Sequence, residues 1–218
     1  MSLHDQHIAI MDSAADYADF DGLRILVPSE VYHPHEWSST RFLLDALPDV
    51  RNMDVLEIGG GSGALALAVK RRGARKVVAT DLSEKACAAM ECNALLNGLV
   101  LEVRQGDLFF PVRADEHFDL VIFNLPLMDK PVVNQAELAL CDPDGELLTR
   151  FLRGLPEVVR PGGMALFTHA NISAPLPSPS AGPSPSAGPL GITGRISSVA
   201  ETRREGGEIF RVLWWRPH

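Results

Sequence analysis

The stretch that decides the fold is Val55-Leu56-Glu57-Ile58-Gly59-Gly60-Gly61-Ser62-Gly63. Its first four residues suit a buried strand, and the strand runs directly into a glycine-rich turn. An apolar segment over residues 64–72 follows with the character of a helix, and Gly73 is placed to end it. Glycines let a backbone turn tightly and approach a ligand closely, while the N-terminus of the following helix offers unpaired N–H groups. The stretch therefore predicts a strand–turn–helix unit that can cradle a ligand.

The glycine spacing alone fits more than one ligand. Gly59-x-Gly61-x-x-Ala64 matches the fingerprint of dinucleotide-binding turns. Gly59-x-Gly61-x-Gly63 matches loops that hold S-adenosylmethionine (SAM). A tight turn without any ligand is the third reading. The absence of a Lys or Arg after the glycines argues only against a P-loop.

Strands and helices alternate on the C-terminal side of this unit. Further strands are predicted over residues 76–80, 101–105, 118–123 and 164–168, with helices over 84–97 and 146–160 between them. Two extended segments, 195–202 and 208–215, then read as a hairpin. This order predicts an α/β fold with a Rossmann-like, mostly parallel seven-stranded sheet, helices on both faces and an antiparallel C-terminal hairpin.

Polar side chains follow four of these strands. Glu57, Asp81, Asp107 and Asn124 all stand at or just beyond predicted carboxyl ends. Ligands of open α/β sheets bind at that edge, so we expect these four side chains to converge on one crevice. Asp81, 18 residues after Gly63, is placed to accept hydrogen bonds from ribose hydroxyls.

The flanking regions are expected to differ from the central unit. A helix over residues 7–20, short extended pieces over 23–27 and 31–33, and a helix over 40–47 would form an N-terminal extension or lid, residues 1–47. Residues 48–218 would form the ligand-binding domain. Within it, a Pro/Ser/Ala/Gly-rich segment over 173–191 contains a duplicated hexapeptide with no apolar periodicity, which predicts a surface loop.

Charge and composition exclude several classes of partner. Residues 1–50 carry nine acidic residues against two arginines, a net charge of −7, while the 218-residue chain carries −8. Such a region repels a phosphate backbone, so nucleic acid is not expected as a partner. No apolar run approaches the roughly 18 residues of a membrane span, and the N-terminus lacks a signal-peptide pattern, so we expect a cytoplasmic protein. Cys87, Cys92 and Cys141 have no metal-ligand spacing, and no metal is expected.

Taken together, the motifs resemble those of class I SAM-dependent methyltransferases, and within that class the HemK-like amino-methyltransferases. The resemblance covers roughly residues 30–170. It is carried by the 57–63 stretch, Asp81, Asn93-Ala94-Leu95-Leu96-Asn97-Gly98, Gly106-Asp107 and Asn124-Leu125-Pro126-Leu127, and by Tyr32-x-Pro34-x-Glu36 ahead of them.

The resemblance implies SAM as the cofactor and a role for each matching residue. Glu57, Gly59, Gly60 and Gly61 would hold the methionine part of SAM. Asp81 would bind the ribose and Leu82 would lie against the adenine, whose amino group and ring edge would meet Asp107 and Leu108. Asn124 would face the transferred methyl group and orient the incoming nucleophile, without acting as a general base.

The chain departs from the resembled family at one motif. That family has Asn-Pro-Pro-Tyr where this chain has Asn124-Leu125-Pro126-Leu127, so the aromatic residue that would stack on a planar amide or base is absent. We therefore expect in-line methyl transfer to a small-molecule amine or amino-acid derivative. The side chains expected to wall the acceptor pocket are Tyr32, Trp37, Leu125, Leu127 and His169.

Other functions remain open on the sequence. SAM could serve an intramolecular cyclisation or lyase reaction on the same fold, or the acceptor could be a protein side chain. An NAD-dependent oxidoreductase fits the glycines, yet it leaves Asp107 and Asn124 without a role. A non-catalytic module that retains the fold would not bind SAM.

Overall fold

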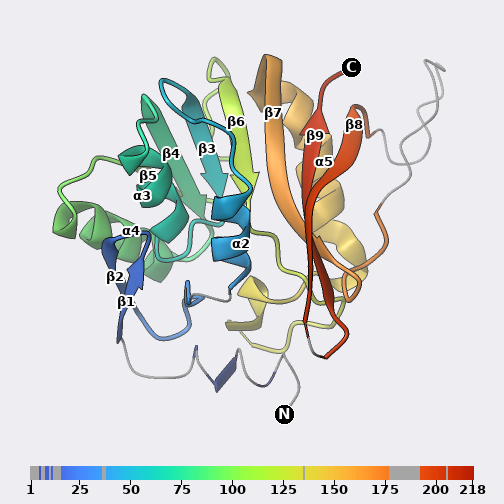
Figure 1. The fold of residues 1–218 in the computed structure, drawn as a ribbon, viewed down its shortest axis with the longest axis horizontal. Helices are drawn as coiled ribbons and strands as arrows, with labels where there is room; N and C mark the ends of the chain where they lie inside the picture. The colour runs from blue at the N-terminus through green and yellow to red at the C-terminus, as the bar shows by residue number, and fades with distance from the viewer. Residues whose placement is uncertain are drawn as a thin grey trace.

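A seven-stranded mixed sheet forms the centre of the molecule (Figure 1). The computed structural model describes residues 5, 8–9, 11, 16–35, 38–134, 136–176, 192–204 and 206–218. The strand order is β5-β4-β3-β6-β7-β9-β8, and the first five strands of that order are parallel. The bounds are β3 (Asp54–Ile58), β4 (Lys76–Asp81), β5 (Glu102–Gln105), β6 (Phe118–Phe123), β7 (Val159–Ala170), β8 (Arg195–Arg203) and β9 (Ile209–Arg216).

The predicted architecture is confirmed. Strand β9 is antiparallel to both β7 and β8, as expected of a C-terminal hairpin. The helices are α2 (Ser39–Asp45), α3 (Ala64–Arg71), α4 (Glu84–Leu96) and α5 (Glu146–Val158), with the short 3-10 turns η1 (Ala136–Ala139) and η2 (Pro143–Gly145) before α5. Strand β7 begins earlier than the predicted residue 164, because Val159 already pairs with Phe118 of β6; an irregularity at residues 160–163, where Gly162 has φ +81°, separates this pair from the regular register that starts at Met164.

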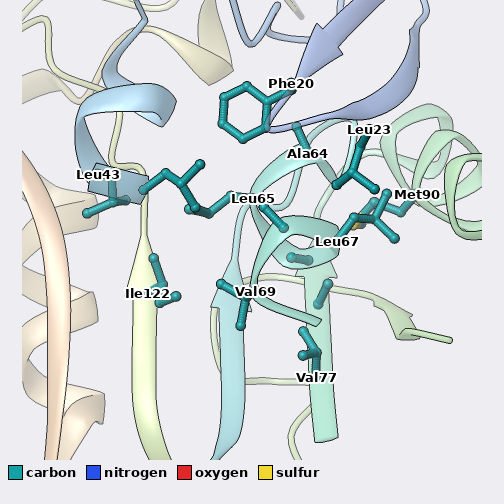
Figure 2. Packing of buried hydrophobic residues seen from close by; sticks show 14 of the residues in the cluster. Phe20, Leu23, Leu43, Ala64, Leu65, Leu67, Val69, Val77, Met90 and Ile122 are labelled. Carbon is teal, nitrogen blue, oxygen red and sulfur yellow. The ribbon is translucent and has the colours of Figure 1, made fainter. Parts of the chain in front are cut away.

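Alternate strand residues bury two separate core layers. In β3, Val55 packs into a cluster with α2, α3 and α4, whereas Leu56 and Ile58 pack into a second cluster with α5. Successive strand side chains point to opposite faces, so a parallel strand that is buried on both faces is apolar throughout. Figure 2 shows the first cluster, in which Leu65 and Val69 of α3 lie over the sheet.

The glycine loop is shaped by close packing against α4. Gly63 is the N-cap of α3 and has a left-handed backbone, φ +81°. A Cβ there would lie 2.9 Å from Met90 Cγ, and one on Gly60 would lie 2.5 Å from Met90 Sδ. Side chains at these positions would force α4 away from the loop, so both glycines are required by packing.

The prediction of a helix over residues 7–20 is wrong for residues 16–20. They form β1 (Asp16–Phe20), which pairs antiparallel with β2 (Leu23–Val27). Asp21 and Gly22 join the strands with φ values of +51° and +71°, the signs required of a type I′ turn. Because Phe20 and Leu23 are buried beside α3 and α4, the hairpin is more favourable than a helix here (Figure 2). Residues 23–27 are extended as predicted, whereas 31–33 form no strand.

Two asparagines, Asn93 in α4 and Asn97 at its C-cap, hold this hairpin on the main body. The Asn93 amide accepts from Leu26 N and donates to Leu26 O, each at 2.8 Å. The Asn97 amide bonds in the same way to Arg24, at 3.1 and 2.9 Å. The two side chains thus substitute for a neighbouring strand along the edge of β2. The duplicated hexapeptide lies outside the described residues, which omit 177–191.

Candidate active site

A cavity of about 680 Å³ opens at the carboxyl edge of the parallel strands. That volume is typical of small-ligand sites. All nine residues predicted to contact the cofactor line it: Glu57, Gly59, Gly60, Gly61, Asp81, Leu82, Asp107, Leu108 and Asn124. The predicted convergence of four strand ends is therefore present in the structure.

Asp81 ties the end of β4 to the two loops beside it. Its carboxylate accepts from Gly61 N and from Ser83 N, both at 2.9 Å. Its backbone carbonyl accepts from Gly106 N at 2.9 Å. Burial raises the pKa of the Asp81 carboxyl, and the donated N–H groups partly oppose that shift. Asp81 is thus an organiser of the loops as well as a candidate ligand of ribose.

Glu57 presents a buried carboxylate oxygen without a hydrogen-bond partner in the described part of the chain. The residue is 3% exposed, and Oε2 is the unpartnered atom. Burial raises the pKa of Glu57 well above its ordinary value, the Ala66 backbone lowers it, and the charge of Asp81 raises it further. Buried polar atoms are normally paired, so an orphaned oxygen beside a cavity fits a ligand that brings a donor.

The opposite end of the cavity pairs Asp107 with Arg150. The two side chains form a salt bridge, and 46% of the Asp107 side chain is exposed. Leu82 is 54% exposed beside them. Arg150 lies on α5, 43 residues from Asp107, and no local pattern in the sequence relates the two. This end offers an apolar surface and a carboxylate, which suits the edge of an adenine ring.

Asn124 is fixed by two threonines from different elements. Its Nδ2 donates to Thr40 Oγ1 of α2 at 3.0 Å, and its Oδ1 accepts from Thr168 Oγ1 of β7 at 3.2 Å. Thr168 Oγ1 also lies 3.3 Å from the Leu125 carbonyl oxygen. These contacts hold the amide in one orientation at the cavity wall. Neither threonine was singled out by the sequence.

The residues expected to contact the acceptor do not all line one cavity. Tyr32 lines the large cavity, and its hydroxyl lies 3.3 Å from Ser39 Oγ. Burial raises the pKa of Tyr32. Leu125 and Leu127 instead line a second cavity of about 30 Å³, which Tyr32 and Asn124 also border. Trp37 lies outside the described residues.

His169 does not line the acceptor pocket as predicted. It is 7% exposed, its Nε2 lies 3.0 Å from the Ala174 carbonyl oxygen, and it is absent from the described lining of both cavities. It directly follows Thr168 in β7, so its side chain projects from the opposite face of the sheet. Burial lowers the pKa of His169, which keeps the ring neutral.

Carboxylates dominate the charged lining of the large cavity. The two cations of that lining, within the described residues, are each paired with one acid. Lys85 Nζ lies 2.6 Å from Glu30 Oε2, and Arg150 pairs with Asp107. The remaining acidic residues of the lining are Glu57, Asp81, Glu84, Asp142 and Glu146. The cavity therefore favours a ligand with positive charge.

The described residues place no three His, Cys, Asp or Glu side chains where they could share a metal ion. No helix in the described ranges is long and apolar enough to cross a membrane.

Comparison with known proteins finds similarity to methyltransferases. The profile of the family described as "Methyltransferase small domain" matches residues 29–166. The "Putative protein N5-glutamine methyltransferase MJ0928" of Methanocaldococcus jannaschii is 33% identical over 161 residues, 71% of this chain and 80% of that protein. The ribosomal protein L11 methyltransferase of Caldicellulosiruptor bescii is 36% identical over 124 residues, 55% of this chain and 40% of that protein.

The solved structures agree on the fold. The 16S rRNA N2 G1207 methyltransferase (RsmC) of T. thermophilus, in complex with AdoMet and guanosine, aligns with a TM-score of 0.67 at 21% identity. The alignment covers 94% of this chain and 50% of that one. The chain thus spans half or less of the length of this structure and of the L11 methyltransferase.

Proposed function

Because this chain belongs to the methyltransferase small domain family and is a SAM-dependent methyltransferase, we propose that its acceptor is a small-molecule amine or amino-acid derivative. The observation that carries the proposal is the position of Asn124. Its amide is held by Thr40 and Thr168 at the wall of a cavity whose charged groups are mostly acidic.

In this proposal SAM occupies the part of the large cavity along the ends of β3, β4 and β5, and the acceptor enters beside Asn124. The unpartnered Glu57 oxygen would accept from the ammonium group of the methionine part. Asp81 would accept from the ribose hydroxyls, and Leu82 and Asp107 would meet the adenine. SAM supplies an activated methyl group on a sulfonium, whose positive charge suits the acidic lining.

Asn124 would orient the acceptor amine for in-line attack. The new N–C bond forms as the S–C bond breaks, and the nitrogen then releases a proton to solvent. Because the sulfonium is a good leaving group, the chain contributes alignment and exclusion of water. Thr40 and Thr168 would act as positioning residues, since their hydroxyls hold the Asn124 amide in place at the cavity wall.

Two features support a small amine over a planar amide or a base. Leu127 stands where the resembled motif has tyrosine, and it borders the small cavity, so it offers no stacking surface. The acidic lining attracts amines and repels anions. The likeness to the rRNA enzyme, at 21% identity, concerns the fold alone.

A second candidate, a protein side-chain N-methyltransferase, is favoured by the names of relatives. One relative is named for protein glutamine, and an electron transfer flavoprotein beta subunit lysine methyltransferase of Mus musculus is 36% identical over 98 residues. Both candidates use the same SAM site and differ in the size of the acceptor.

The deciding experiment follows methyl-labelled SAM in the presence of pooled amines and amino acids, and separately with a protein extract. We expect S-adenosylhomocysteine together with label in a small product. Label confined to protein would refute the small-molecule proposal and support the second candidate. Methylthioadenosine in place of S-adenosylhomocysteine would show an intramolecular cyclase or lyase reaction.

A further inference from the structure

A second, smaller cavity adjoins the acceptor end of the site. Its volume is about 30 Å³, and it shares Tyr32, Asn124 and Ala139 with the large cavity. A cavity of roughly 10–15 Å³ already holds one water molecule, so this space can take a polar group of two or three atoms such as a carboxylate. Its polar lining includes Ser39 and Arg204.

The sheet topology brings Arg204 to this place. Arg204 lies in the turn between β8 and β9, and β9 pairs with β7 so that Phe210 stands opposite Ala170, the last residue of β7. The turn therefore reaches the same edge of the sheet as the ends of β3 and β6, which Figure 1 shows at the lower end of the red hairpin.

The turn that carries Arg204 is held by several contacts. Arg204 N donates to Glu208 O, and Gly207 N donates to Arg204 O, both at 3.0 Å. Asn171 Oδ1 accepts from Ile209 N at 2.9 Å, which ties the turn to the end of β7. The Arg204 guanidinium lies 4.7 Å from the centre of the buried Phe210 ring. A guanidinium held over an aromatic ring loses less freedom when it binds a ligand.

Arg204 carries positive charge to the acceptor end of an otherwise acidic site. In the lining of the large cavity, Lys85 and Arg150 form ion pairs with Glu30 and Asp107, at the end assigned to SAM. Burial raises the pKa of Tyr32, hydrogen bonds with Ser39 oppose that shift, and the charge of Arg204 opposes it further, so the guanidinium lies close to a residue that borders both cavities.

We propose that Arg204 binds a carboxylate of the acceptor, so that the acceptor is an amino acid that presents its amine to Asn124 and its carboxylate to the small cavity. A guanidinium can hold a carboxylate through two parallel hydrogen bonds. Asn124 borders both cavities, so one short molecule can reach both groups. This inference rests on the proposed function, because it needs a small-molecule acceptor.

The test compares matched acceptors. Each of the twenty amino acids is offered beside its decarboxylated amine, and the initial rate of S-adenosylhomocysteine formation gives kcat and KM for each. We expect kcat/KM to be about 10- to 100-fold higher for the amino acid of the preferred pair, the range for a charged hydrogen-bonded contact. Arg204→Met should raise KM for that amino acid about 10- to 100-fold, leave kcat and SAM affinity nearly unchanged, and remove the difference within the pair.

Arg203→Met is the matched control, because Arg203 is 71% exposed and its salt bridge to Glu201 spans 3.6 Å. It should leave KM unaltered. If Arg204→Met does not fold, Arg204→Lys keeps the charge and should show a smaller rise in KM. Equal turnover of amino acid and amine by the unmodified protein would overturn the inference while the proposed function stands. Methylation of protein alone would overturn both.

Discussion

Replacing Asp81 with alanine should change two separable properties. In the ligand-free protein its carboxylate accepts from Gly61 N and Ser83 N at 2.9 Å. Burial of this carboxylate outweighs those bonds in its pKa, so the cost of Asp81→Ala comes from leaving the Gly61 and Ser83 N–H groups without an acceptor, about 1–3 kcal/mol for each unpaired buried donor. We expect a net loss of about 2 kcal/mol in the free energy of unfolding. For a chain of this size that corresponds to roughly 4–8 °C in melting temperature.

The same substitution should weaken SAM binding if Asp81 meets the ribose. The loss of the ribose contact is expected to cost about 1–3 kcal/mol, or roughly 5- to 150-fold in the dissociation constant. Calorimetry at a temperature where the variant is folded measures this separately from stability. Asp115→Ala, which removes an exposed acid in the loop before β6, is the control and should change neither property.

Each result tests a different part of the reasoning. A lower melting temperature with unaltered SAM affinity would make Asp81 a loop anchor and remove it from the ribose site. Weakened binding with no change in melting temperature would show that the two N–H contacts contribute nothing to stability. Asp81→Asn keeps an acceptor oxygen but not the charge. Its melting temperature and SAM affinity should lie between those of the unmodified protein and those of Asp81→Ala.

Three further predictions follow from the structure. Burial raises the pKa of Glu57, so between about pH 4.5 and the raised pKa the folded protein binds more protons than the unfolded chain. The free energy of unfolding should therefore fall as the pH rises through that range. Urea unfolding at a series of pH values should show a smaller fall for Glu57→Gln. Asn93→Leu removes hydrogen bonds to Leu26 and Ser62 and should cost about 3–5 kcal/mol in urea unfolding, against about 1 kcal/mol for Asn97→Leu; equal costs would show that the burial of Asn93 and its contact with Ser62 add nothing beyond the pairing along β2. A short Gly-Ser linker in place of residues 177–189 should preserve melting temperature and SAM affinity, and a large loss would show that this segment packs on the body.

The SAM half of the site could be predicted from sequence because it depends on local rules. Strand segments are recognisable from their apolar residues, and the carboxyl ends of parallel strands must share one edge. Glu57, Asp81, Asp107 and Asn124 follow from those two facts, and all four line the cavity. The glycine loop follows from the same strand–helix unit.

The N-terminal hairpin was missed although a signal was present. Apolar residues at 8, 11, 15 and 18 favoured a helix, but Asp21-Gly22 between alternating residues is a strong hairpin signal. The turn preference of Asp21-Gly22 therefore outweighed the helical spacing of the apolar residues.

The partners of the site residues could not be predicted, because they come from distant elements. Asn124 meets Thr40 and Thr168, 84 and 44 residues away, and Asp107 meets Arg150, 43 residues away. Finding them requires knowledge that β7 lies beside β6 and that α2 and α5 cover opposite faces of the sheet. Local sequence patterns predict the strands, but they do not indicate which helix packs over which strand.

The two halves of the candidate site come from different kinds of structure: one from strand ends, the other from connecting segments. The large cavity, the candidate site for SAM, is lined by strand ends that the sheet itself holds in place. In the proposed function the acceptor half would consist of Tyr32, the segment between β6 and α5, and the turn that carries Arg204. That segment packs on the N-terminal region, where Met11 lies in one cluster with Met128 and Leu140. Substitutions in these connections leave the buried strands untouched, so under the proposed function a residue such as Leu127 would influence the choice of acceptor without altering the SAM site.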